Sequence, residues 1–490
     1  MSRLVIVSNR VPPPRERGQL AGGLAVALRE ALAGREALWF GWSGSNHTPQ
    51  EPPRITRMGR LTFATIDLPQ ADFTGYYRGF SNGMLWPLLH HRMGLAVFKR
   101  EDLAAWRRVN ETFAATLLGL LRPDDLVWVQ DYHLIALGAG LRRRGFAGRL
   151  GFFLHVPFPP RAIFEALPQG VALLADFAAY DVLGVQTEED AGHLNELLTG
   201  AALTVRAGSY PIGIDPDAFA AEARDAGAGP EGVRLRESLG ARALILGVDR
   251  LDYSKGLPHR FRGFAQLLNR FPEHRNRVTM LQVAPVSRGD VAQYRALRRE
   301  LDELAGHING EHAEFDWIPL RYLTQTVPRG TLAGFQRIAA IGLVTPLRDG
   351  MNLVAKEFVA AQDPDNPGAL VLSRFAGAAQ AMEGAILVNP HDPDETAEAL
   401  HIALTMPETE RRARWQTMWR AVHLHTAAGW ARRFLADLDP PGRTAANRVD
   451  GWRHPHPDPL ARRGGEGEAS RPFAPAALHG TGSGESDRPG

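Results

Sequence analysis

Short apolar runs rich in β-branched residues alternate with longer segments of helical periodicity along most of the chain. In the first half, the strand-like runs are Leu4–Ser8, Leu126–Gln130, Leu150–His155 and Val182–Gln186, and the helical segments include Gly22–Ala33, Ala104–Leu121 and Glu188–Thr199. A second series of strand-like runs comprises Ala243–Val248, Val278–Val283, Ile341–Val344, Ala369–Ser373 and Ala385–Val388. Apolar strands that alternate with helices predict parallel sheets wrapped by helices. The chain is therefore expected to be an α/β protein with two doubly wound units in succession.

The composition also predicts where these units meet and where the folded part ends. Between Ala220 and Leu239, apolar periodicity gives way to Ala, Gly, Glu and Arg, so we expect a linker there. The expected domains cover residues 1–228 and 229–407, and a long Arg- and Trp-rich amphipathic helix is predicted over about 408–438. Residues 439–490 have little to bury, so this tail is expected to be disordered.

The overall composition excludes several classes of protein. None of the 490 residues is a cysteine, which rules out disulfides, thiolate metal sites and Cys nucleophiles. The 56 Lys and Arg residues nearly balance the 54 Asp and Glu residues, so binding to nucleic acid is not expected. No apolar run approaches the roughly 20 residues of a membrane span. The N-terminus does not resemble a signal peptide, so a cytoplasmic protein is expected.

Two cationic side chains follow the first strand-like run of the second unit. Arg250 and Lys255 lie in the segment Asp249-Arg250-Leu251-Asp252-Tyr253-Ser254-Lys255-Gly256, and Lys255 is one of only three lysines in the chain. Ligands bind at the carboxyl ends of parallel strands in such folds. A guanidinium and an ammonium there could neutralise a diphosphate without a metal. The alternative is that Arg250 pairs with Asp249 or Asp252 at the surface.

Glycines and carboxylates mark two further candidate positions for an anionic sugar ligand. The loop after the first strand lacks the G-x-G-x-x-G fingerprint of dinucleotide binding, but Gly22 and Gly23 open a helix whose backbone N–H groups could hold a phosphate, with Arg10 nearby. A plain turn is the alternative. After Ile341–Val344, Asp349 could accept from sugar hydroxyls, and Glu357 could hold the hydroxyls of a ribose.

Aromatic and polar side chains of the first unit gather at strand ends and in loops. They are Tyr76, Tyr77, Asn82, Trp86, Asp131, His133 and His155. Each aromatic ring or histidine alone would more often belong to a core. Together they are typical of a sugar site, with aromatic walls for the ring faces and polar groups for the hydroxyls. Asp131 and His133 form one short pair without a second convergent set, so a metal site is not expected.

At these residues the chain resembles the retaining enzymes of glycosyltransferase family 20. The resemblance runs from about Arg3 to about Trp430. Its motifs include Val7-Ser8-Asn9-Arg10, Ala21-Gly22-Gly23-Leu24, Leu85-Trp86-Pro87, Asp131-Tyr132-His133-Leu134, His155-Val156-Pro157-Phe158-Pro159, Ser287-Arg288-Gly289-Asp290 and Arg348-Asp349-Gly350-Met351-Asn352-Leu353.

The resemblance implies a GT-B fold, two Rossmann-like domains with the last helix returning to the first of them. It implies a hexosyltransferase that moves glucose from a nucleotide diphosphate glucose, usually UDP-glucose, to glucose 6-phosphate and forms α,α-trehalose 6-phosphate with retention. No metal and no cofactor are implied. A homo-oligomer is left open. The remaining alternatives are a relative with glycerol 3-phosphate as acceptor or ADP- or GDP-glucose as donor, and a catalytically silent sugar-phosphate sensor.

Site residues follow from the resemblance by matching position. The donor would contact Gly22, Gly23, Arg250, Lys255, Asp349, Gly350, Met351, Asn352, Leu353, Val354, Ala355, Lys356 and Glu357, with Val327 at the base. The acceptor would contact Arg10, Tyr77, Trp86, Asp131 and Arg288. His155 would lie against the donor glucose. The catalytic group would be Arg250, Lys255, His155 and Asp131.

Overall fold

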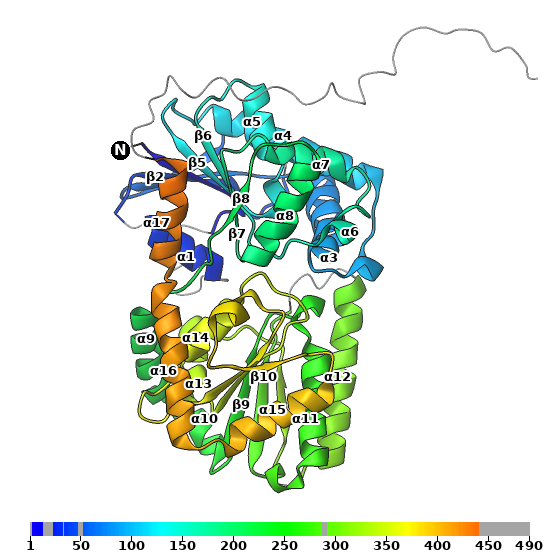
Figure 1. Ribbon diagram of the computed structural model, residues 1–490, viewed down its shortest axis with the longest axis vertical. Helices are drawn as coiled ribbons and strands as arrows, with labels where there is room; N and C mark the ends of the chain where they lie inside the picture. The colour runs from blue at the N-terminus through cyan, green and yellow to red at the C-terminus, as the bar shows by residue number, and fades with distance from the viewer. Residues whose placement is uncertain (1, 13–22, 33, 48–51, 287–291, 441–490) are drawn as a thin grey trace, which may run out of the picture. The chain divides into compact units, whose positions relative to one another are not determined.

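A computed structural model describes residues 2–12, 23–32, 34–47, 52–286 and 292–440 (Figure 1). Within these ranges, eight strands form a first sheet in the order β3-β4-β2-β1-β5-β6-β7-β8, which is parallel except for the antiparallel pair β3 and β4. Its strands are β1 (Leu4–Arg10), β2 (Ala37–Trp42), β3 (Arg54–Met58), β4 (Leu61–Ile66), β5 (Leu126–Gln130), β6 (Arg149–Phe153), β7 (Val182–Val185) and β8 (Ala207–Ser209).

A second sheet follows in the chain. In the described residues it has six parallel strands in the order β11-β10-β9-β12-β13-β14. These are β9 (Ala243–Val248), β10 (Val278–Val283), β11 (Leu320–Leu323), β12 (Ile341–Val344), β13 (Ala369–Ser373) and β14 (Ile386–Val388). The predicted fold of two doubly wound α/β units is confirmed.

Helices connect the strands of both sheets. Those of the first sheet are α1 (Gly23–Leu32), α2 (Gln70–Phe73), α3 (Trp86–Leu89), α4 (Arg100–Leu118), α5 (Leu137–Arg143), α6 (Arg161–Phe164), α7 (Gly170–Phe177) and α8 (Glu188–Gly200), with a π-helix, η1 (Thr74–Leu85), before α3. The later helices are α9 (Pro216–Ala228), α10 (Pro230–Leu239), α11 (Leu257–Arg270), α12 (Ala292–His312), α13 (Arg329–Ile338), α14 (Leu353–Ala361), α15 (Pro393–Thr405), α16 (Glu408–Leu424) and α17 (Ala427–Leu438). None of the described helices combines the length and apolarity that a membrane crossing requires.

The segment expected as a linker is helical, so that prediction was wrong. α9 and α10 occupy it, and α9 packs against α13 and α14 of the second unit. Small residues there serve close packing: a Cβ on Gly334 of α13 would lie 2.7 Å from the backbone of Ala226. The glycine- and alanine-rich composition therefore reflects a tight helix crossing. The division of the domains at residue 228 stays a prediction.

The helix expected over 408–438 is two helices, so its continuity was also predicted wrongly. Thr426 caps α17, its Oγ1 accepting from the backbone N–H of Gly429 at 3.0 Å. α16 packs against α14, whereas α17 packs against β6 and β7 of the first sheet (Figure 1). There the Phe434 ring stacks on Trp128 with 4.7 Å between centroids. The break at His425 thus lets one C-terminal segment cover both units.

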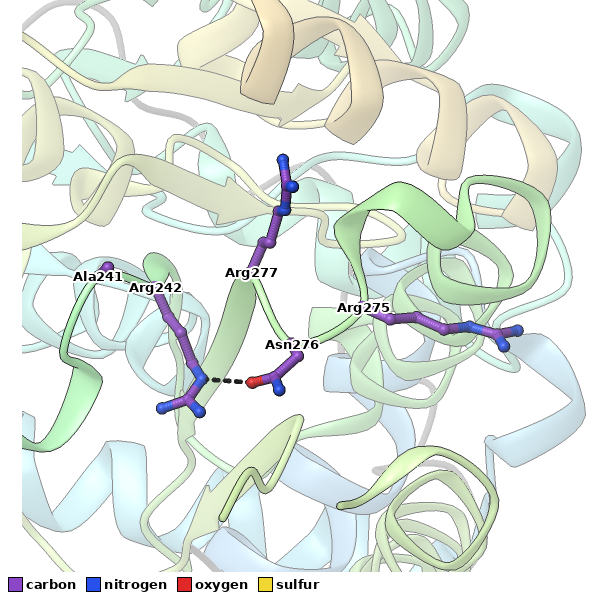
Figure 2. Close-up of a pocket in the computed structure, with 5 residues that line it drawn as sticks. All are labelled: Ala241, Arg242, Arg275, Asn276 and Arg277. Carbon is purple, nitrogen blue, oxygen red and sulfur yellow. Dashed lines mark hydrogen bonds between the residues drawn. The ribbon is translucent and has the colours of Figure 1, made fainter. Parts of the chain in front are cut away.

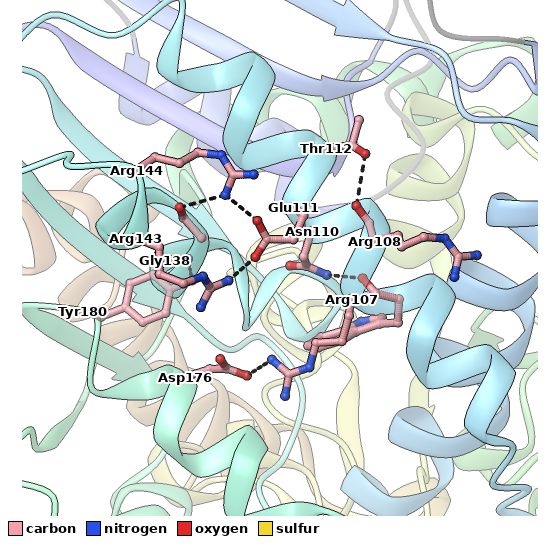
Figure 3. A network of polar contacts seen from close by, with 12 residues as sticks. Arg107, Arg108, Asn110, Glu111, Thr112, Gly138, Arg143, Arg144, Asp176 and Tyr180 are labelled. Atoms are coloured by element: carbon pink, nitrogen blue, oxygen red, sulfur yellow. Dashed lines mark hydrogen bonds and ion pairs between the residues drawn. The ribbon is translucent and has the colours of Figure 1, made fainter. Parts of the chain in front are cut away.

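Arginine–carboxylate contacts tie α4 to its neighbours on the first sheet (Figure 3). Glu111 of α4 pairs with Arg143 and Arg144 at the end of α5. Arg107 of α4 pairs with Asp176 of α7. Both partners of the two Glu111 pairs are partly exposed, so each of these pairs contributes little to stability, at most about 1 kcal/mol. Burial of the apolar faces of these helices holds the layer together.

The tight turn before α17 predicts that alanine substitutions at two glycines differ in their effect on stability. A Cβ on Gly213 would lie 1.5 Å from the His425 carbonyl oxygen, so Gly213→Ala must displace backbone. We expect it to lower the free energy of unfolding by about 1–3 kcal/mol. Gly306→Ala is the control, because this exposed position in α12 has open space around it and alanine favours a helix by up to about 1 kcal/mol. Urea unfolding measures both; equal stability of the two variants would contradict the tight contact.

Candidate active site

Each sheet has a point where its strand order reverses, and the candidate residues lie there. In the first sheet the order reverses between β1 and β5, and in the second between β9 and β12. Arg10 ends β1, and Asp131 follows β5. Arg250 and Lys255 follow β9, and Asp349 follows β12. Ligands bind at such crevices beyond the carboxyl ends of parallel strands.

Lys255 and Asp349 form an ion pair across the second of these crevices. The Lys255 ammonium lies 2.5 Å from Asp349 Oδ2, and the Asn352 side chain donates to the same oxygen at 3.0 Å. Burial raises the pKa of Asp349, but Lys255 and these hydrogen bonds outweigh it and hold the pKa below its usual value. The carboxylate is therefore charged and fixes the ammonium in place.

The structure decides against the surface pairing considered for Arg250. Asp249 is paired with Arg260, and Asp252 accepts hydrogen bonds from the Ser254 N–H and the Tyr294 hydroxyl, each at 3.0 Å. The Arg250 side chain is exposed beside them. Both neighbouring carboxylates are thus engaged with other groups, and the guanidinium extends toward solvent.

A buried arginine lies beneath this loop. Arg260 of α11 donates to Asp249 at 2.7 Å and Gln282 at 2.9 Å, and its Nε donates to Thr345 at 3.0 Å. These partners belong to the end of β9, to β10 and to the residue after β12. Arg260 therefore holds together the strand ends whose loops carry Lys255 and Asp349.

The start of α14 offers backbone donors next to this ion pair. Asn352, at φ 74°, caps the helix, with its Oδ1 accepting from the Ala355 N–H at 3.3 Å. Leu353 and Val354 begin the first turn, half-buried, with their N–H groups at the helix N-terminus. Such an end favours a phosphate through its backbone donors and dipole. Gly350 and Met351 lead into it.

Two charged residues of α14 have partners within the protein. Lys356 is buried, and its ammonium donates to the Ile212 carbonyl at 2.6 Å. Burial lowers the pKa of Lys356 to about 7, with a further contribution from Arg433. The Glu357 carboxylate lies 3.5 Å from Arg329; burial raises its pKa despite that cation. Lys356 thus points toward the segment that connects the two units. The Glu357 carboxylate, in contrast, is partly exposed.

Aromatic side chains gather near the carboxyl ends of β1 and β5. The Arg10 guanidinium lies 5.9 Å from the centroid of the Trp42 ring. The Tyr77 ring is stacked between Phe73 and His133, at 5.3 and 5.8 Å. Arg10 and Tyr77 are therefore brought to one aromatic cluster.

Trp86 links the two units. The indole is buried, and its Nε1 donates to Asp252 at 3.4 Å. Asp252 belongs to the loop that carries Lys255. A side chain placed with the acceptor by resemblance thus contacts the loop placed with the donor.

Asp131 adopts a strained backbone conformation. Its φ of 73° and ψ of 164° lie in a region that is essentially restricted to glycine. The surroundings enforce it: the Asp131 N–H donates to the Phe153 carbonyl at 2.7 Å, and Oδ1 accepts from the His155 N–H at 3.2 Å. Strain of this kind, retained at a strand end, is typical of functional positions.

Hydrogen bonds on both ring nitrogens fix His155. The Ile212 N–H donates to Gln186 Oε1 at 3.0 Å, which turns the Gln186 amide nitrogen toward His155 Nδ1 at 3.3 Å. Nδ1 must then accept, so Nε2 carries the proton and donates to Gln130 Oε1 at 2.8 Å. Burial lowers the pKa of His155 to about 3. The imidazole is therefore neutral and oriented.

The His155 backbone approaches the loop after β12. A Cβ on Gly350 would lie 2.4 Å from the His155 carbonyl oxygen, so only glycine fits there.

Val327, half-buried, packs on the core before α13. Gly23 opens α1, whereas Gly22 and Arg288 lie outside the described residues.

A separate cavity of about 440 Å³ is lined by Ala241, Arg242, Arg275, Asn276 and Arg277 (Figure 2). Arg242 and Arg277 directly precede β9 and β10, so the cavity is at the amino ends of these strands. Figure 2 shows the Arg275 and Arg277 side chains pointing apart. This cavity is therefore not part of the candidate site.

Sequence reasoning missed Arg260 and Gln186. Arg260 stands among apolar residues of α11 that are buried, and Gln186 directly follows β7. A charged residue inside an apolar helical stripe and an amide at a strand end are signals for buried polar partners. Their partners could not be identified, because the contacts join distant parts of the chain.

The strain at Asp131 predicts an unusual order of stability. Asp131→Gly should be more stable to urea than Asp131→Ala by roughly 1–2 kcal/mol, because glycine relieves strain of about 1–3 kcal/mol and loses part of this through its greater freedom when unfolded. At Asp225, an exposed position in α9, the order should reverse. An alanine variant at 131 as stable as the glycine variant would show that the conformation is not strained.

Known proteins resemble this chain over nearly all of its described length. The sequence model of glycosyltransferase family 20 matches residues 2–440. A trehalose-6-phosphate synthase from Sinorhizobium fredii is 46% identical over 456 residues, which cover 89% of this chain and 98% of the relative.

Solved structures show the same likeness. An α,α-trehalose-phosphate synthase (UDP-forming) from Burkholderia xenovorans, in complex with glucose-6-phosphate, is 45% identical with a TM-score of 0.87; the match covers 89% of this chain and 100% of that one. A structure from E. coli bound with UDP-2-fluoro glucose is 44% identical with a TM-score of 0.85, covering 89% of this chain and 99% of the other. With these matches and its two Rossmann-like units, the chain belongs to glycosyltransferase family 20 and has the GT-B fold.

Proposed function

We propose that this chain transfers glucose from UDP-glucose to glucose 6-phosphate, with retention, and releases UDP and α,α-trehalose 6-phosphate. One observation carries the proposal. At the carboxyl ends of β9 and β12, a fixed ammonium lies next to a helix N-terminus, with the exposed Arg250 on the same loop, and these groups suit a nucleotide diphosphate sugar. Relatives named UDP-forming trehalose-phosphate synthase, over 40% identical, support this substrate pair.

In this proposal the donor occupies the crevice between β9 and β12. Arg250 and Lys255 neutralise the diphosphate, and the N–H groups of Leu353 and Val354 receive a phosphate oxygen. Asp349 accepts from glucose hydroxyls, and Glu357 accepts from the ribose hydroxyls. Lys356 supports α14 from behind through Ile212.

The acceptor occupies the crevice between β1 and β5. Arg10 is the cation on this side for a phosphate, and the Tyr77 and Trp86 rings supply apolar walls for a hexose. Asp131 accepts from an acceptor hydroxyl. Placing Arg288 on the acceptor phosphate remains part of the proposal that rests on resemblance.

The transfer exchanges one bond for another at the anomeric carbon. The bond from C1 to the β-phosphate oxygen breaks, a bond from C1 to the acceptor oxygen forms on the same face, and the leaving phosphate takes the acceptor proton. Charge then accumulates on the phosphate, where Arg250 and Lys255 stabilise it without reorganisation. His155, which the resemblance places against the donor glucose, is neutral and adds no charge there, and Gln130 and Gln186 hold its two ring nitrogens.

Other candidates fit the geometry less well. A silent sensor would not need the ion pair of Lys255 and Asp349 or a strained Asp131. Glycerol 3-phosphate would leave the aromatic walls without a sugar ring. Val327 is placed at the base by resemblance only, so ADP- or GDP-glucose is the alternative donor. A cytoplasmic location, where nucleotide sugars and hexose phosphates are made, belongs to the same proposal.

Removing either cation should slow chemistry more than it weakens the fold. We expect Lys255→Ala and Arg250→Ala each to lower kcat by about 10²–10³, the usual cost of losing one electrostatic donor to a transition state. Lys99→Ala is the matched control, because Lys99 is exposed at the start of α4. Steady-state kinetics with thermal unfolding separates the two effects. Wild-type turnover from a folded Lys255→Ala variant would refute the leaving-group role.

A substrate panel tests the whole assignment. Purified protein is incubated with UDP-, ADP- or GDP-glucose, and with glucose 6-phosphate, glucose or glycerol 3-phosphate. UDP-glucose with glucose 6-phosphate should react fastest, and glucose should be a poor acceptor because a charge-assisted phosphate contact typically contributes about 1.5–3 kcal/mol. NMR of the product should show two α-linked anomeric centres. No transfer from any donor would favour the sensor.

A further inference from the structure

Three metal-ligating side chains lie together on the second unit. Glu273 and His274 belong to a short 3-10 helix, η5 (Pro272–His274), and His401 belongs to α15. His274 Nε2 lies 2.9 Å from His401 Nδ1, and Glu273 Oε1 lies 3.7 Å from that same nitrogen. All three ligand atoms lie within 4.8 Å of one another. Two separate elements thus supply one cluster.

The two imidazoles are held in place. His274 is 7% exposed. The Phe271 ring stacks on His401, with 4.1 Å between centroids and 11° between the planes. The two ring nitrogens face each other at hydrogen-bond distance, so a metal that binds both displaces the proton between them.

We propose that Glu273, His274 and His401 form a Zn²⁺ site. Zinc takes imidazole nitrogens at about 2.0–2.1 Å, which at a tetrahedral angle places two of them about 3.3 Å apart. The observed spacing of 2.9 Å requires only a small separation of the rings. Glu273 is 54% exposed in its side chain, so its carboxylate can turn to complete the third position, and water takes the fourth.

The charges around the cluster limit its affinity without preventing binding. The Arg277 guanidinium is a positive charge that acts on His274, so it also repels a metal ion bound there. Arg270 is already paired with Asp394 and Glu398 of α15. Glu273 is then the carboxylate of the cluster that balances the metal charge.

A metal here would act as a clamp distant from the chemistry. η5 lies between α11 and the amino end of β10, whereas the candidate active site lies at the carboxyl ends of the strands. α11 packs against α15, and the metal would join the end of one to the other. Binding should therefore raise the stability of the second unit and leave turnover largely unchanged.

The test is calorimetric titration of Zn²⁺ into tag-free, chelator-treated protein, together with thermal unfolding. Wild type should bind one Zn²⁺ at micromolar concentration and unfold at a higher temperature when it is bound. His401→Ala should lose at least tenfold in affinity and lose the thermal shift. His307→Ala is the control, because His307 pairs with Glu311 on the exposed face of α12 and should change neither.

A second variant and a spectroscopic signal distinguish loss of the site from misfolding of the protein. Glu273→Gln changes an exposed side chain and should weaken Zn²⁺ binding in a folded protein. Co²⁺ added to wild type should show tetrahedral d–d absorption that is lost in both variants. Zn²⁺ affinity or Co²⁺ absorption that is the same in wild type, His401→Ala and Glu273→Gln would overturn the proposal, as would no binding to wild type.

Discussion

The guanidinium of Arg260 is the contact on which the candidate site depends. It is fully buried and reaches Asp249, Gln282 and Thr345, so one side chain joins the ends of β9, β10 and β12. Removing one partner of such a buried pair typically costs about 3–5 kcal/mol. Its loss would therefore release the strand ends that position Lys255 and Asp349.

Above this contact the site is arranged for charge. Asp349 holds Lys255 before any ligand arrives, and α14 starts four residues later. On the other sheet, Asp131 keeps a strained backbone and His155 keeps a fixed, neutral ring. The protein has already met the cost of ordering these groups when it folds, which is how preorganised donors stabilise a transition state.

Local patterns predicted much of this architecture. Runs such as Val278–Val283 are buried on both faces of a parallel sheet, so continuous apolar sequence identified them as strands. The same reasoning failed at α9, where alanine and glycine look like a linker but allow a close helix crossing. It also failed at His425, because the break between α16 and α17 depends on a contact with Gly213.

The residues of the candidate site were likewise predicted only in part. Arg250, Lys255 and Asp349 follow strand ends, so topology alone brings them to one edge of a sheet. Other contacts of the site join residues far apart in the chain. Lys356 donates to Ile212, Trp86 donates to Asp252, and Ile212 orients the Gln186 amide that holds His155. Sequence spacing holds no information on such contacts.

In our proposal, Lys255 is a diphosphate cation that Asp349 holds in position. Calorimetric titration of UDP into wild type, Lys255→Ala, Asp349→Asn and the double variant tests both roles. We expect Lys255→Ala to weaken UDP binding most, and Asp349→Asn to weaken it less, because the ammonium is then present but no longer held. In the Lys255→Ala background, Asp349→Asn should have no further effect. Unchanged UDP affinity in folded Lys255→Ala protein would contradict the role of Lys255.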